Sequence, residues 1–312
     1  MDNKVVYLIS PPRSLSTAFL RSIQARNDFH VINEPGTYAY FNTHSEVVKK
    51  RLFGDEIPQL DTYDKIEENV FQMSKYKNVF VKEISFSMEE YLKFHSNTNS
   101  NWIKQKNLHF IFLLRNPYDT ALSIYKKLKP DGLKTLNKQL GYISSYHLYQ
   151  YIVEHGSNEP IIIKSEDLYH DSIKLMKSLC KQLNISYTSN MTTWNHISNN
   201  MPLKDSKVSE YTQHWHSDAM QSNGFHIPNN HHQNSIQDRS DGDGLKNNVL
   251  FENIDDINIR KVYQDVYQEH LPFYQELLLQ DRHILTFNSF DYEFYILWYI
   301  VMLMVTCFII RK

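Results

Sequence analysis

Apolar and polar positions follow two alternating patterns in the first part of this chain. Short runs rich in Val, Ile, Leu and Phe are bounded by turn residues, which predicts buried strands of a parallel sheet. Between these runs, apolar residues recur at helical spacing. Strands that alternate with helices predict an α/β domain of three layers, with helices on both faces of a central parallel sheet. The expected strands are residues 5–9, 29–33, 79–84, 108–114 and 160–164, and the expected helices are residues 18–23, 45–53, 61–76, 118–128, 133–155 and 171–183.

The sheet pattern does not continue into the second part of the chain. Residues 192–205 are irregular, and residues 206–222 have helical spacing. Residues 223–248 are rich in Asn, His, Asp, Ser and Gly, which predicts an exposed, mobile loop. Residues 255–281 again have helical spacing, interrupted at Pro272.

The C-terminal tail differs from the rest. Residues 294–310 contain no charge, and Arg311 and Lys312 follow them. A helix of that length spans roughly 25 Å, just under the ~30 Å hydrocarbon core, and Tyr and Trp cluster at one end. We therefore expect a globular domain over 1–289 and a single-pass membrane anchor over 290–312, with a buried C-terminal helix as the alternative. The domain is expected to face the cytosol, because a C-terminal segment inserts only after synthesis ends.

Composition excludes several classes of protein. The formal net charge is −2, so no overall charge attracts the chain to nucleic acid. Cys180 and Cys307 cannot form a disulfide framework and lack zinc spacing, which favours a reducing, cytosolic setting. The late histidines, such as His214 and His216, have neither paired helical spacing nor a cysteine partner, so no metal site is expected.

The first candidate site lies between the first strand and the first helix. Pro11 and Pro12 predict a turn, and Arg13 is followed by the hydroxyls of Ser14 and Ser16. The first amides of a helix lack intrahelical partners, the helix dipole adds positive charge, and a guanidinium offers paired donors, which together suit a phosphate-like anion. No Gly-Lys-Ser/Thr follows, so a P-loop for magnesium-ATP is a poor fit. A hydroxyl-rich N-cap is the alternative.

The second candidate site follows the most apolar strand. Arg115 leaves the carboxyl end of that strand, where ligands of open parallel sheets bind. Ser123 lies about two helical turns later, so a helix that folds back beside the strand would bring its hydroxyl near the guanidinium. The alternative is an Arg115–Asp119 pair that caps the helix.

Both stretches resemble motifs of the sulfotransferase family. Residues 12–17 resemble its 5′-phosphosulfate loop, Pro-(Lys/Arg)-Ser-Gly-Thr-Thr, with Leu15 where the family often has Gly. Residues 115–125 resemble its 3′-phosphate motif, Arg-(Asp/Asn)-Pro-x-Asp-x-x-x-Ser-x-Tyr. Residues 163–168 also resemble the family, and their carboxylates are expected to be structural. Residues 239–247 depart from its C-terminal nucleotide loop, because the Lys and Trp are missing and two Asp are added.

The resemblance implies a P-loop NTPase-like sulfotransferase fold and the donor 3′-phosphoadenosine 5′-phosphosulfate (PAPS), with no metal. Arg115 and Ser123 would bind the 3′-phosphate. The 5′-phosphosulfate would be bound by Arg13, Ser14, Ser16, Thr17 and Ala18.

Sulfuryl transfer also needs a base beside the first loop. Glu34 ends the second strand at the same sheet edge as Arg13, and Pro35 is expected to hold it extended. A turn cap or a pair with Arg13 is the alternative role, and His30 is a weaker base. Lys82 ends the third strand and would stabilise the leaving oxygen, unless it is a solvated strand end. Glu34, Arg13 and Lys82 are thus the candidate catalytic residues.

The sequence therefore leaves two hypotheses about function. One is a PAPS-dependent sulfotransferase that acts by in-line displacement on a hydroxyl or amine of a sugar, lipid, phenol or peptide. The other is a non-catalytic, membrane-tethered nucleotide-binding or scaffold protein that retains the fold. A nucleoside or shikimate-type kinase is disfavoured by the missing P-loop lysine pattern.

Overall fold

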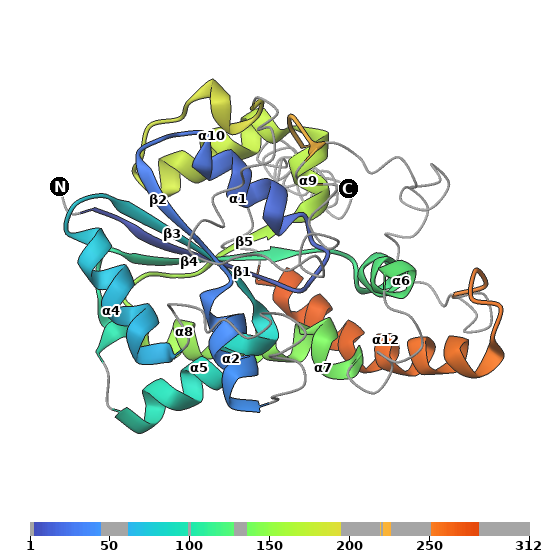
Figure 1. The fold of residues 1–312 in the computed structure, drawn as a ribbon. Helices are drawn as coiled ribbons and strands as arrows, with labels where there is room; N and C mark the ends of the chain where they lie inside the picture. The colour runs from blue at the N-terminus through green and yellow to red at the C-terminus, as the bar shows by residue number, and fades with distance from the viewer. Residues whose placement is uncertain are drawn as a thin grey trace, which may run out of the picture.

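Five parallel strands form the centre of the molecule, in the order β2-β3-β1-β4-β5 (Figure 1). The computed structural model describes residues 3–44, 62–98, 101–127, 136–194, 219, 221–225 and 251–280. The strands are β1 (Val5–Ser10), β2 (Phe29–Asn33), β3 (Asn78–Ile84), β4 (Leu108–Leu114) and β5 (Ile161–Lys164). All five strands expected from the apolar runs are confirmed, with shifts of about one residue at their ends.

Strand β1 lies in the middle of the sheet, and all of its residues are buried. Val5 is in register with Val79 of β3 on one side and with Leu108 of β4 on the other. Side chains alternate along the strand, so Tyr7 packs into one hydrophobic cluster and Leu8 into another. This two-sided burial explains why the run is apolar throughout.

Helices cover both faces of the sheet, as Figure 1 shows, and so confirm the three-layer α/β architecture. One face carries α1 (Ser16–Gln24), α9 (Ser165–His170), α10 (Ser172–Gln182) and the short η3 (Ser189–Met191). The other carries α2 (Pro35–His44), α4 (Tyr63–Ser74), α5 (Ser85–Thr98), α8 (Tyr142–His155) and η1 (Trp102–Lys104). A third apolar cluster joins α6 (Pro117–Lys127), α7 (Leu136–Leu140) and α12 (Ile257–Leu278).

Three helices differ from expectation. The helix expected over 133–155 is broken at Gly141, which has φ +74° and lies against the Ser85 hydroxyl, so that a Cβ there would clash. Helix α12 continues through Pro272, where an interruption was expected. Helix α2 begins directly at Pro35, although only a turn was expected, because proline suits the first position of a helix.

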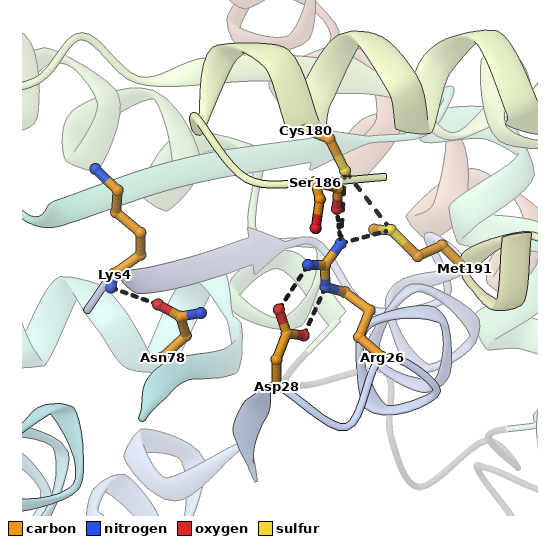
Figure 2. A network of polar contacts seen from close by, with 7 residues as sticks. All are labelled: Lys4, Arg26, Asp28, Asn78, Cys180, Ser186 and Met191. Carbon is orange, nitrogen blue, oxygen red and sulfur yellow. Dashed lines mark hydrogen bonds and ion pairs between the residues drawn. The ribbon is translucent and has the colours of Figure 1, made fainter. Parts of the chain in front are cut away.

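A buried guanidinium ties together the amino-terminal edge of the sheet (Figure 2). Arg26 follows α1, and its Nη2 forms an ion pair of 2.7 Å with Asp28. Its Nη1 donates to the Ser186 carbonyl and to Met191 Sδ at 3.1 Å, and it lies 3.8 Å from Cys180 Sγ. The turn between α1 and β2 is therefore held against α10, and Cys180 packs as a buried thiol.

Several predicted features lie outside the described residues. These are the helix at 45–53, most of the helix at 206–222 and of the loop at 223–248, and the tail at 290–312. Among the helices that the structure does describe, none combines the length and the apolar character that a membrane span requires. The division of the chain at residue 289 stays a prediction.

Candidate active site

The loop between β1 and α1 has an unusual backbone. Arg13 and Leu15 adopt left-handed conformations, with φ values of 63° and 62°. A residue with a Cβ pays sterically for that conformation, and glycine does not, so a left-handed site is where glycine fits best. Leu15 is the N-cap of α1, and no side chain caps the helix. The alternative of a hydroxyl-rich N-cap is therefore wrong.

The residues of this loop surround the start of α1. The Ser14 side chain is fully buried, and its hydroxyl has no hydrogen-bond partner among the described residues. Ser16 and Ala18 are buried in the first turn, and Thr17 is partly exposed between them. Because the first amides of a helix point out of its N-terminus, this turn offers donors where the loop closes.

The two arginine loops contact each other. Arg115 Nη1 donates a hydrogen bond of 2.8 Å to the backbone carbonyl of Arg13. The Arg13 Nε in turn donates one of 3.0 Å to the Ser123 hydroxyl on α6. Strands β1 and β4 are neighbours, so both loops emerge side by side from the carboxyl edge of the sheet. The expected meeting of a guanidinium with Ser123 is observed, but the guanidinium is that of Arg13.

The loop after β4 is held from two sides. The Tyr142 hydroxyl, at the start of α8, donates to the Arg115 carbonyl at 2.5 Å and lies 2.9 Å from the Thr120 hydroxyl. Glu166, in the first turn of α9, accepts the Asn116 amide at 3.3 Å, and burial raises the pKa of its carboxyl. The structural role expected for the carboxylates after β5 is confirmed for Glu166. Tyr142 was missed, because nothing in its local sequence links it to Arg115.

Glu34 and Lys82 form a buried ion pair at the ends of β2 and β3. The Lys82 side chain is 2% exposed, so the alternative of a solvated strand end is wrong. The Glu34 amide donates to the Lys82 carbonyl at 2.6 Å, which aligns the two backbones as well. The structure thus brings two candidate catalytic residues into direct contact, on the opposite side of β1 from Arg115.

The backbone of Glu34 differs from the extended conformation that was expected before Pro35. Its φ is +53°, in the left-handed region. Its carbonyl accepts the amides of Thr37 at 3.1 Å and Tyr38 at 3.3 Å, so Glu34 stands directly before α2 and starts the helix. A sharp reversal from β2 into α2 requires this conformation, and the requirement outweighs the local preference set by proline.

Glu83 completes the cluster and was not predicted. It is fully buried, and its Oε1 accepts the Gly36 amide at 2.6 Å. Burial raises the pKa of this carboxyl to about 8, the Gly36 hydrogen bond opposes that shift, and the nearby Glu34 adds to it. The adjacent charges of Lys82 and Glu83 inside the otherwise apolar strand at 78–84 were the one feature of the sequence that could have indicated a buried role for Glu83.

The remaining candidates lie elsewhere. His30 is in register with Val79 near the start of β2, at the edge of the sheet opposite Glu34, and is therefore badly placed as a base. Within the described part of the chain, no cluster of His, Cys, Asp and Glu is arranged to hold a metal ion. His214 and His216 lie outside that part.

The family of the chain follows from comparison with known sequences. A family model described as a sulfotransferase domain matches residues 4–253. The chain belongs to this sulfotransferase family. Membership confirms the resemblance to the family and supports a transferase of this general class.

The related proteins are distant. The chain is 28% identical over 228 residues to branched-chain-amino-acid aminotransferase-like protein 2 of Arabidopsis thaliana, and 25% identical over 234 residues to protein 1 of the same name. These matches cover 72% and 73% of this sulfotransferase-family chain, which spans only 37% of the length of each relative. Among solved structures, the sulfotransferase domain of the Synechococcus PCC 7002 olefin synthase covers 70% of this chain and 89% of its own, with 15% identity and a TM-score of 0.44.

Tyr142→Phe tests the support of the Arg115 loop. The change removes the donor to the Arg115 carbonyl, so we expect the free energy of unfolding to fall by about 1–3 kcal/mol in urea denaturation. Tyr149→Phe on the same helix is the control, because the Tyr149 ring packs against Phe112 within strand β4. An equal loss in both variants would contradict the assigned role.

Glu83→Gln tests the protonation of the buried carboxyl. Glu83 keeps its proton to about pH 8 in the folded chain, whereas its ordinary pKa is 4.5. Between these pH values the folded state holds a proton that the unfolded state releases, so stability falls as pH rises, by up to about 1.4 kcal/mol per pH unit. We expect wild type to show this fall relative to Glu83→Gln in denaturation at pH 5–9.

The quantity to measure is the difference in the free energy of unfolding between wild type and Glu83→Gln at each pH. His109, whose pKa burial lowers from 6.5 to about 4, gives the opposite slope below about pH 6.5, and subtraction removes it. A difference that does not depend on pH would show that Glu83 is ionised in the folded chain.

Proposed function

We propose that this chain transfers a sulfuryl group from PAPS to a hydroxyl or amine of an acceptor. The observation that supports this most is the contact between the two arginine loops, Arg115 to Arg13 and Arg13 to Ser123. A donor with a phosphosulfate at one end and a separate 3′-phosphate at the other needs two neighbouring anion sites. Family membership supports the same class of reaction.

The donor would lie across the carboxyl ends of β1 and β4. The buried Ser14 hydroxyl, which has no partner among the described residues, is suited to donate a hydrogen bond to an oxygen of the phosphosulfate end. Arg13, Ser16, Thr17 and Ala18 would add a guanidinium and the first amides of α1. Arg115 and Ser123 would bind the 3′-phosphate from the neighbouring loop.

Glu34 is the proposed base. The acceptor oxygen or nitrogen attacks sulfur, its proton passes to the Glu34 carboxylate, and the bond from sulfur to the bridging oxygen breaks. The bisphosphate leaves with the bonding electrons. Lys82 holds Glu34 in a buried ion pair and supplies positive charge near the developing negative charge on the leaving oxygen. No step in this scheme requires a metal ion.

The proposal extends to the acceptor and to the C-terminal tail. Sugars, lipids, phenols and peptides all offer a suitable nucleophile, and the fold does not select among them. We retain the proposal that residues 290–312 anchor the chain in a membrane with the domain toward the cytosol, supported only by the uncharged run at 294–310.

Donor binding is tested by thermal stabilisation of the full chain with 3′,5′-bisphosphoadenosine, 5′-AMP and magnesium-ATP. The bisphosphate at a hundred times its Kd is expected to stabilise by about 2.7 kcal/mol. Arg115→Ala is expected to lose about 2–3 kcal/mol of binding, because a hydrogen bond to a charged group is removed. Arg115→Lys keeps the charge and loses the planar fork, so we expect partial loss.

Lys77→Ala is the matched control, since it removes an exposed positive charge before β3 at the opposite sheet edge. An equal loss of bisphosphate binding in Lys77→Ala would show that the loss in Arg115→Ala comes from the change in overall charge. Stabilisation by magnesium-ATP in place of the bisphosphate would instead favour a kinase.

Glu34→Gln tests the base. With PAPS and a panel of sugars, lipids, phenols and tyrosyl peptides, we expect wild type to form sulfated product and the variant to lose about 10²–10⁴-fold in rate. Bisphosphate binding should persist. Because Gln removes the carboxylate partner of the Lys82 ammonium, urea denaturation of Glu34→Gln beside wild type separates loss of the base from loss of stability.

Full transfer by Glu34→Gln would exclude it as the base. A wild-type chain that binds the bisphosphate but sulfates no acceptor would favour the non-catalytic nucleotide-binding alternative.

A further inference from the structure

Glu83 contacts the turn that carries Glu34, the proposed base. It follows Lys82 on β3, and consecutive side chains of a strand point to opposite faces, so Glu83 faces α2. Its carboxyl packs tightly against the first turn of that helix. A Cβ on Gly36 would lie 2.9 Å from Glu83 Oε1 and 3.1 Å from Cδ, so a larger residue there would displace the carboxyl from this position.

The turn that Glu83 contacts is strained. Glu34 has a left-handed backbone, and such a conformation persists only where the surroundings enforce it. Two hydrogen bonds bracket the turn: the Glu34 amide to the Lys82 carbonyl, and the Gly36 amide to Glu83. Both acceptors belong to consecutive residues of β3. The strand therefore holds the turn on each side of Pro35.

The second carboxyl oxygen of Glu83 points to a role beyond a helix cap. Oε2 is buried and has no hydrogen-bond partner among the described residues. The titratable groups close enough to interact electrostatically with this carboxyl are Glu34, Lys82, Tyr7 of β1 and Tyr63 of α4. Only Lys82 among them is cationic, and it is already bound to Glu34. An ionised Glu83 would therefore place a second negative charge beside Glu34.

We propose that Glu83 is a positioning residue, whose buried carboxyl holds the Glu34 turn through the Gly36 amide and so keeps the Glu34 carboxylate against Lys82. The inference rests on the proposed function only in treating Glu34 as the base. As a neutral acid, Glu83 fixes the turn without competing for the Lys82 ammonium. Once ionised, it repels Glu34.

One amide signal reports on this contact directly. Gly36 is the only glycine that follows a proline in the chain, so labelling with carbonyl-¹³C proline and ¹⁵N glycine isolates its amide in NMR spectra of the full protein. We expect the Gly36 proton shift to titrate with a midpoint near pH 8 in wild type. In Glu83→Gln the titration should disappear, and in Glu34→Gln its midpoint should fall, because the neighbouring negative charge is gone.

Kinetics of Glu83 variants distinguish a positioning role of Glu83 from a contribution to stability alone. Glu83→Met leaves the Gly36 amide without an acceptor, and we expect kcat to fall by about tenfold to a hundredfold while Kd for 3′,5′-bisphosphoadenosine stays within about twofold. Glu83→Gln still accepts that amide and should restore kcat at pH 7. If Glu83→Met does not fold, the Gln variant and the amide titration decide the matter.

The outcomes distinguish this inference from the proposed function. A Gly36 signal that does not titrate, or whose midpoint is the same in Glu34→Gln, overturns the positioning role. Equal losses of kcat and bisphosphate affinity in Glu83→Met overturn it too. If wild type sulfates no acceptor, the proposed function fails, and the midpoint difference between wild type and Glu34→Gln alone decides whether Glu83 acts on Glu34.

Discussion

The hydrogen bond from the Arg115 guanidinium to the Arg13 carbonyl is the contact on which the candidate site depends. It joins two loops that are about a hundred residues apart in sequence and adjacent only because β1 pairs with β4. The same Arg13 then binds Ser123 through its side chain. The contact therefore orders both arginine loops at once. The Tyr142 hydroxyl donates a hydrogen bond to the Arg115 carbonyl and so helps to hold the Arg115 loop in place.

Backbone strain gathers at the same edge of the sheet. Within the described part of the chain, six non-glycine residues have a positive φ, and three of them, Arg13, Leu15 and Glu34, lie in the two loops that follow β1 and β2. Each such residue costs on the order of 1–3 kcal/mol unless its surroundings compensate. Here the neighbouring strands compensate through Arg115 on one side and through Lys82 and Glu83 on the other.

Buried charge is concentrated on the other side of β1. A buried ion pair adds little net stability, because desolvation offsets the attraction between the charges, so the Glu34–Lys82 pair is better explained by orientation than by stability. Glu83 adds a third titratable group, and its raised pKa leaves the cluster with one carboxylate for one ammonium near neutral pH. That balance is what allows three ionisable side chains to share one buried site.

The apolar runs determined the five strands, since helices cover both faces of a parallel sheet. The residues that follow two of those runs pointed to the two arginine loops. The two arginine motifs also identified the family. Only the tertiary structure decided which guanidinium binds Ser123, because that depends on how the β1 and β4 loops cross. It alone revealed Tyr142 and Glu83, whose partners are 27 and 47 residues away in sequence. Local patterns report burial, whereas a hydrogen bond between distant elements exists only once packing has brought them together.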